Sequence, residues 1–158
     1  MSFCSPKIFD GYSTCFRQWR AEGTHCKFLH GYAVYFKVIF KGELDERNWC
    51  VDFGISKRSQ TLIEGKTLKE YLDWLLDHTT IIAKDDPELQ WFQDADNKGL
   101  IQLRIIDHTG AERFAEFLYD KINKWVRLET KGRVYIESIE FFENGKNSAI
   151  YKESNYKS

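Results

Sequence analysis

The sequence lacks the features that mark several classes of protein. It has no long apolar run, so no segment is expected to span a membrane. Its formal net charge of −1 and its pI near 6.4 leave no basic excess of the kind that binds nucleic acid. It shows no internal repeat and no linker. We therefore expect one domain over residues 1–158, with neither a membrane nor a nucleic acid as its partner.

Signs of secretion are also missing. The opening MSFCSPKIF lacks the basic start and apolar core of a signal peptide. The even number of cysteines would allow two disulfides, but without a signal peptide a reducing, cytoplasmic location is the expectation. In that compartment cysteines are more often buried, metal-bound or catalytic. The four are Cys4, Cys15, Cys26 and Cys50.

Aromatic residues, by contrast, are abundant at 16% of the chain, enough for a dense core. Residues 30–42, HGYAVYFKVIFKG, alternate as a strand with one more apolar face. Residues 5–18 are the expected hairpin partner of this strand. The buried face is predicted to carry Tyr32, Val34, Phe36, Val38 and Phe40.

The next pattern is helical and covers residues 66–78. Pro87 and Gly99 interrupt the segment that follows, and residues 99–106 are predicted to be extended. The helix has apolar side chains at the three- and four-residue spacing of one helical face. They are Leu68, Tyr71, Leu72, Leu75 and Leu76.

A second helix is predicted to start at Thr109 and to run through residue 126. Thr109 and Glu112 match a capping box, in which each side chain satisfies a free N–H at the helix start. Residues 133–142 then alternate as a strand, and an Asn-Gly turn leads into a returning strand, NSAIYKE. The order strand, strand, helix, helix, strand, strand predicts a single α+β domain.

Two sites carry side chains suited to proton transfer. Cys26 lies between His25 and Lys27, and positive charge favours the reactive thiolate. Asp77 precedes His78 at the end of the first helix, where a carboxylate could orient an imidazole. Each has a simpler explanation: a structural thiol in a loop, and a histidine stabilised by a helix C-terminus.

His30, at the start of a strand, and Glu143, beside a turn, are candidates for binding. A zinc site needs three or four ligands, and those near His30 are Cys15, His25, Cys26 and Tyr32. The carboxylate of Glu143 could accept two parallel hydrogen bonds from a 2-amino-pyrimidinone edge, as in guanine or pterin. Alternatively, His30 is structural and Glu143 is a solvated turn residue.

In order and spacing, these pieces resemble the 6-pyruvoyltetrahydropterin and 6-carboxytetrahydropterin synthases, the latter from the queuosine pathway. The resemblance covers residues 8–152, nearly the whole chain. The last matching piece is a glutamate eight residues before a tyrosine. The matching segments are HCKFLHGY (25–32), WCVDFGISK (49–57), LDH (76–78), TGAE (109–112) and Glu143 to Tyr151.

The resemblance implies a tunnelling fold (T-fold), with a four-stranded antiparallel sheet and two helices on one face. It implies homo-oligomers, trimers or hexamers, with active sites between subunits. The implied substrate is 7,8-dihydroneopterin triphosphate. The products of the two reaction types are 6-pyruvoyl- and 6-carboxytetrahydropterin.

The resemblance also implies a role for each candidate residue. Cys26 would be the general base or acid, and Asp77 and His78 of a neighbouring subunit would complete a proton relay. Glu143 would anchor the pterin ring. Zinc would hold the hydroxyls of the substrate side chain and lower their pKa. Two further residues would lie beside the substrate: Thr109 and Glu112.

The zinc ligands depart from the pattern of this family, which uses a first-strand histidine and both histidines of HGH. Here HGH is HGY, so His30 is retained and Tyr32 stands at the third position. The first-strand histidine falls near Cys15 or Phe16. Either a rearranged set such as Cys15, His30 and another residue holds zinc, or the site is metal-free and the phenol of Tyr32 forms hydrogen bonds where zinc would have been.

Three functions are consistent with these residues. The first is a pterin-processing lyase with a Cys/Asp/His proton relay. The second is a tunnelling-fold oligomer that binds a pterin or purine and has altered or lost the chemistry. The third is an unrelated α+β domain that uses its aromatic residues for protein contacts.

Overall fold

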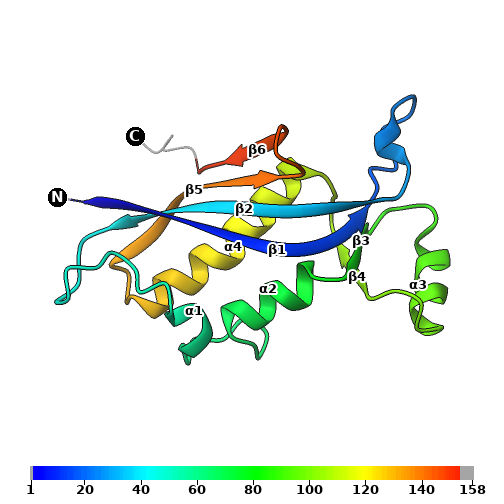
Figure 1. The fold of residues 1–158 in the computed structure, drawn as a ribbon. Helices are drawn as coiled ribbons and strands as arrows, with labels where there is room; N and C mark the ends of the chain where they lie inside the picture. Colours follow the sequence, from blue (N-terminus) through cyan, green and yellow to red (C-terminus); the bar gives the residue numbers. More distant parts are fainter. Residues whose placement is uncertain (1, 154–158) are drawn as a thin grey trace.

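A computed structural model describes residues 2–153, in which a six-stranded sheet carries helices against one face (Figure 1). Across the sheet the strand order is β4-β3-β1-β2-β5-β6. The elements are β1 (Phe3–Phe16), η1 (His25–Lys27), β2 (His30–Gly42), α1 (Ile55–Arg58), α2 (Leu68–Leu76), β3 (Thr79–Ala83), α3 (Leu89–Asn97), β4 (Leu103–Ile106), α4 (Ala111–Glu129), β5 (Val134–Phe142) and β6 (Ser148–Tyr151).

The two longest strands, β1 and β2, pair antiparallel at the centre of the sheet. The strand predicted over residues 30–42 is confirmed with those bounds. Every second side chain from Val34 to Phe40 is buried against the helices, as strand alternation predicts. A register shift between Phe9 and Tyr12 interrupts the β1–β2 ladder, and Gly11 adopts a φ of +87° there.

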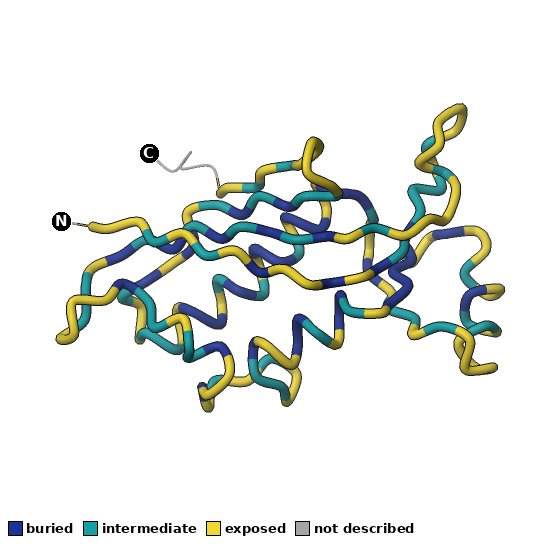
Figure 2. The backbone as a smooth tube through the Cα atoms, in the orientation of Figure 1, coloured by how far each residue is buried: buried dark blue, intermediate teal, exposed yellow. Residues whose placement is uncertain are grey.

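Helices α2 and α4 cover the inner face of the sheet, and dark-blue buried segments line that boundary in Figure 2. The predicted apolar stripe of α2 is confirmed, since all five of its residues are buried. Thr67 caps this helix by accepting a hydrogen bond from the Glu70 amide at 3.2 Å. Helix α4 spans nineteen residues, and its apolar stripe packs on β5 and β6.

The predicted sheet of four strands is corrected to six. The strands β1, β2, β5 and β6 form the expected antiparallel part, and β3 and β4 extend it by parallel pairing. All five residues of β3, TTIIA, are buried. A strand buried on both faces reads as a continuous apolar run without alternation, so the pattern of the sequence did not reveal it.

The predicted capping box at the start of α4 is wrong. The N-cap residue is Gly110, and no side chain in the described part of the chain caps this helix. The hydroxyl of Thr109 donates instead to the backbone oxygen of Arg17, at 2.7 Å. Gly110 has a φ of +116°, which L side chains rarely adopt, so glycine is needed for the chain to turn into α4.

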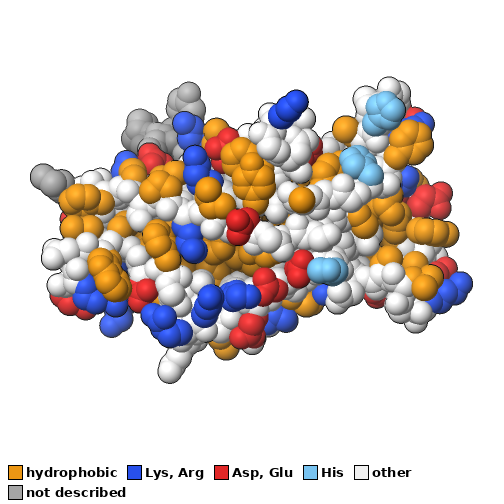
Figure 3. All heavy atoms as spheres, in the orientation of Figure 1, with side chains coloured by type: hydrophobic (Ala, Val, Ile, Leu, Met, Phe, Trp, Pro, Cys, Tyr) orange, Lys and Arg blue, Asp and Glu red, His pale blue; other side chains and the backbone are white. Residues whose placement is uncertain are grey.

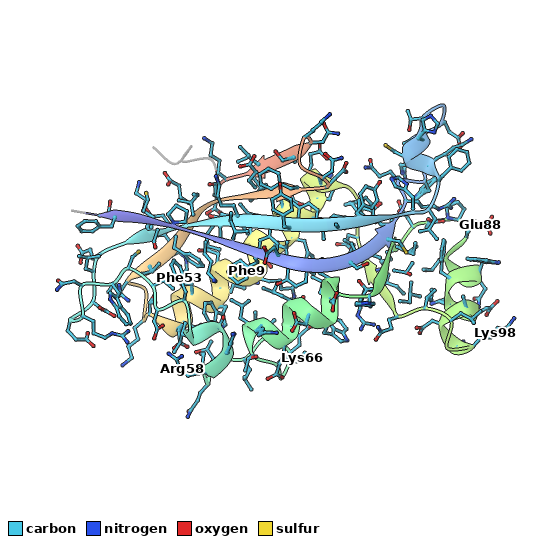
Figure 4. All side chains as sticks on the ribbon, in the orientation of Figure 1. Phe9, Phe53, Arg58, Lys66, Glu88 and Lys98 are labelled. Atoms are coloured by element: carbon cyan, nitrogen blue, oxygen red, sulfur yellow. The ribbon has the colours of Figure 1, made fainter. Side chains whose placement is uncertain are left out.

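An ion pair fixes the end of β1 to the loop after β3. Arg17 donates from Nε and Nη2 to the two carboxylate oxygens of Asp86, at 2.8 and 2.5 Å. The Asp86 side chain has no exposed surface, and it also accepts from the amide of Glu88. Glu88 and Lys98 mark the two ends of α3 in Figure 4. This pair therefore holds the α3 segment beside the β1 terminus.

Replacing this arginine tests the pair. Arg17→Met should lower the free energy of unfolding by about 3–5 kcal/mol, because it leaves the Asp86 charge buried without a partner. Arg20→Met is the matched control, since Arg20 is 75% and Asp85 43% exposed in a similar pair. That change should cost less than about 1 kcal/mol. Urea denaturation followed by circular dichroism measures both, and equal losses would contradict the assignment.

Candidate active site

The candidate site lies where the β1–β2 connection meets the start of α4 and the end of β5. Figure 3 shows histidine side chains on the surface at the upper right, where Figure 1 places η1 and the start of β2. Both His25 and His30 are exposed there. The ring of Phe16 at the end of β1 contacts that of Phe114 on α4, with centroids 4.8 Å apart. This contact brings the end of β1 and the first turn of α4 together.

Cys26 is solvent-exposed in the single turn of η1. The Thr24 hydroxyl accepts a hydrogen bond from the Cys26 amide, at 3.2 Å. The Cys26 carbonyl accepts from the amide of Gln18, at 2.8 Å. The backbone of this cysteine is thus anchored at both its N–H and its C=O, while its thiol stays accessible. An accessible thiol in a fixed turn is suited to proton transfer with a bound molecule.

His30 and Tyr32 lie side by side at the start of β2, with ring centroids 4.2 Å apart. The backbone oxygen of Phe28 lies 2.9 Å from Nδ1 of His30. Because a carbonyl only accepts, Nδ1 carries a proton, and when the ring is neutral its lone pair lies on Nε2. Burial, followed by the charges of Glu143 and Cys26, raises the pKa of Tyr32 to about 12. The phenol is therefore protonated near pH 7 and can donate a hydrogen bond.

Glu143 follows β5 and is half-buried. Burial and then the neighbouring charge of Glu112 raise the pKa of this carboxyl group. His30 and the amide N–H of Ala111, at the start of α4, act in the opposite direction. A carboxylate beside a helix N-terminus is favourably placed, since the amides there have no partners within the helix.

Asp77 and His78 form a second group at the junction of α2 and β3. Nδ1 of His78 lies 3.0 Å from Oδ1 of Asp77, and that oxygen also accepts from the amide of Ser13, at 3.3 Å. His78 has a φ of +57°, which is uncommon for a residue other than glycine. Its amide donates to the Ser13 carbonyl, so β1 holds this conformation. The carboxylate orients the imidazole, and the His78 side chain is exposed.

Within one chain, among residues 2–153, no hydrogen bond or ion pair joins Cys26 to Asp77 or His78. The structure instead brings Cys26, His30, Tyr32 and Glu143 into one electrostatic neighbourhood.

Comparisons with known proteins agree with this architecture. A model of the 6-pyruvoyl tetrahydropterin synthase family matches residues 7–154. The chain belongs to this family. Membership of this family supports pterin-processing lyase activity in general terms. None of the helices in the described part of the chain is long and apolar enough to cross a bilayer.

Solved structures show the same fold. An uncharacterized protein from Wolinella succinogenes, WS1659, is 22% identical with a TM-score of 0.77, over 98% of this chain and 99% of that one. The 6-pyruvoyl tetrahydropterin synthase of Caenorhabditis elegans is 16% identical with a TM-score of 0.61, over 98% and 97%. The Plasmodium vivax enzyme is 14% identical with a TM-score of 0.65, over 96% and 99%. A search of curated proteins finds no match.

The zinc implied by this family does not fit the residues present. Cys15 points to the opposite face of the sheet from His30 and Tyr32, because its neighbours Thr14 and Phe16 are the cross-strand partners of Tyr32 and His30. Its sulfur lies 3.1 Å from the Thr80 hydroxyl. Across residues 2–153, no three His, Cys, Asp or Glu side chains converge as a metal site.

The other predicted residues are placed as follows. Glu112 is exposed, and its charge acts on Glu143. The hydroxyl of Thr109 is used in its bond to β1. Sequence reasoning missed the Ala111 amide as a partner of Glu143 and the Ser13 backbone as the partner of Asp77. No pattern in the sequence indicated either partner.

The coupling of the two glutamates is testable. Glu112→Gln removes a negative charge beside Glu143, so the pKa of Glu143 should fall. Glu116→Gln is the matched control on the same helix, because Glu116 pairs with Arg113 and does not act on Glu143. Carbon-13 NMR titration of the glutamate carboxyl groups measures the shift. An unchanged Glu143 pKa in Glu112→Gln would refute the coupling.

Proposed function

We propose that this protein is a lyase acting on 7,8-dihydroneopterin triphosphate, of the 6-carboxy- or 6-pyruvoyl-tetrahydropterin synthase type. The observation that carries the proposal is the grouping of an accessible thiol and a half-buried carboxylate around one site. The thiol belongs to Cys26 and the carboxylate to Glu143. The chain's membership of the family directs this site towards a pterin.

Glu143 binds the pterin ring in this proposal. Its carboxylate accepts two parallel hydrogen bonds from the 2-amino-pyrimidinone edge, and paired bonds to a charged acceptor are strong. The carboxylate must be ionised to accept both. The N–H of Ala111 and the nearby His30 favour the ionised form, although burial and Glu112 oppose it. The ring would thus be fixed with its side chain directed towards the β1–β2 connection.

Cys26 then moves a proton at the side chain of the substrate. The thiol is exposed in η1, so it is accessible to a bound molecule. In this proposal Thr109 and Glu112, at the start of α4, lie beside the substrate. A positioned acid or base of this kind contributes typically 10²- to 10⁴-fold to a rate.

Asp77 and His78 complete the relay from a neighbouring subunit. The pair is already oriented, since Asp77 holds Nδ1 of His78 and leaves Nε2 free. Among residues 2–153 no hydrogen bond or ion pair joins it to Cys26, as expected for a site shared between subunits. The proposal therefore includes a homo-oligomer, a trimer or hexamer. It also places the reaction in the cytoplasm, where four free thiols such as these are usual.

The first test is turnover. Wild-type protein incubated with 7,8-dihydroneopterin triphosphate should yield a 6-carboxy or 6-pyruvoyl product by mass spectrometry. Cys26→Ala should lower kcat about 10²- to 10⁴-fold, because the proton-transfer group is lost. Cys4→Ala is the matched control, an exposed thiol near the other end of β1 that should leave kcat unchanged.

Two outcomes would refute the proposal. Full activity in Cys26→Ala would remove this residue from the mechanism. Unchanged substrate with a folded wild-type oligomer would favour a protein that binds pterins or purines without converting them. In that case equilibrium binding of the pterin, compared between wild type and Glu143→Ala, would show whether the pocket still binds the ring.

A second test asks whether the site is shared. Cys26→Ala and His78→Ala chains should each be nearly inactive alone. Mixed oligomers of the two should regain part of the activity, because some sites then combine an intact Cys26 with an intact His78. If both residues acted within one chain, no mixed oligomer would contain a complete site. Activity of co-refolded mixtures, with gel filtration to confirm assembly, distinguishes the two arrangements.

A further inference from the structure

Two aromatic rings fill the inner part of the candidate site. Phe16 and Tyr32 stack with their centroids 4.1 Å apart and their planes at 12°. Phe16 is the cross-strand partner of His30, and Thr14 is the partner of Tyr32. Side chains of directly paired residues point to the same face, so Phe16, His30 and Tyr32 all project towards the helices.

The rings form a continuous series from the surface to the core. His30 is exposed, Tyr32 is half-buried and Phe16 has no exposed surface. Phe114, also buried, closes the series edge-on against Phe16 at 4.8 Å. Successive rings are in van der Waals contact, so they fill the space between His30 and Phe114.

This series stands where the family resemblance expects three histidines. A zinc ion needs at least three donor atoms at about 2.0–2.3 Å. Phe16 has no lone pair to offer, and its ring packs against those of Tyr32 and Phe114. Cys15, the other residue near the expected first-strand ligand, bonds Thr80 on the far face of the sheet. Of the three expected ligand positions, only that of His30 keeps a donor typical of zinc, Nε2, with Nδ1 held by the Phe28 carbonyl.

We propose that this site binds its ligand without a metal ion, and that the stacked rings of Phe16 and Tyr32 fill the places of two metal ligands. Nε2 of His30 and the hydroxyl of Tyr32 are then the groups that hydrogen-bond the hydroxyls of a ligand's side chain. The ligand assignment rests on the proposed function. The inference that the working site holds no metal does not rest on the proposed function, because it follows from the donor atoms alone.

The experiment measures zinc directly. The full-length wild type, purified from zinc-supplemented medium, should contain substoichiometric zinc by plasma mass spectrometry. It should also give no saturable binding isotherm with zinc chloride. The double variant Phe16→His/Tyr32→His restores three imidazoles on one face and should gain about one zinc per subunit. Adding His30→Ala to that double variant should abolish the gain. Circular dichroism and gel filtration confirm that each variant folds.

Two results would overturn the proposal. One is stoichiometric zinc in the wild type that His30→Ala removes, and this arm decides the matter even if the double variant does not fold. The other is a folded double variant that gains no zinc, because the rings would then not occupy the ligand positions.

Turnover in the presence of EDTA separates this proposal from the proposed function. A zinc-free, inactive wild type would leave the metal inference standing and refute the lyase. A zinc-loaded, active wild type would refute the metal inference and support the lyase.

Discussion

The register between β1 and β2 is the constraint on which the rest of the molecule depends. It sets which side chains of β1 face the helices and which face away. With Phe16 opposite His30, the rings of Phe16 and Tyr32 stack inward and Cys15 is turned to the other face. A slip of one residue would exchange these faces and would put Cys15 beside His30. The chemistry available at the site is therefore decided by backbone pairing as much as by side-chain identity.

The rest of the site is arranged around this pair of strands. Arg17, just after β1, accepts a hydrogen bond from Thr109 before α4 and donates to Asp86 in the loop before α3. Gly110 lets the chain turn so that the first amide of α4 acts on Glu143. On the opposite edge of β1, Ser13 fixes both the backbone of His78 and the carboxylate of Asp77. One strand thus positions both groups of candidate residues.

Elements of the fold could be predicted from the sequence where apolar residues recur with the period of a strand or a helix. Alternation located β2 and its buried face, and the helical stripe located α2. The segment of β3 has no alternation because both its faces are buried, so it was missed and the sheet was predicted with four strands. The start of α4 was misplaced because Thr109 fits a local cap but bonds a residue 92 positions away. At the site, Cys26, His30, Tyr32 and Glu143 were chosen from the sequence. The face of the sheet to which Cys15 points could not be predicted, because it depends on the β1–β2 register, which no local pattern gives.

The parallel pairing of β3 with β1 has a consequence for how the molecule assembles. Thr14 meets Thr79 across 65 residues of chain, whereas the β1–β2 pairs nearest their connection close a short loop. Closing a long loop costs more chain entropy, and non-local pairings form slowly. We therefore expect the β1–β2 hairpin, whose connection carries the Cys26 thiol, to form early. The Asp77–His78 pair is expected to become ordered only when β3 docks on β1. The two groups of candidate residues therefore differ in contact order, although β1 supports both.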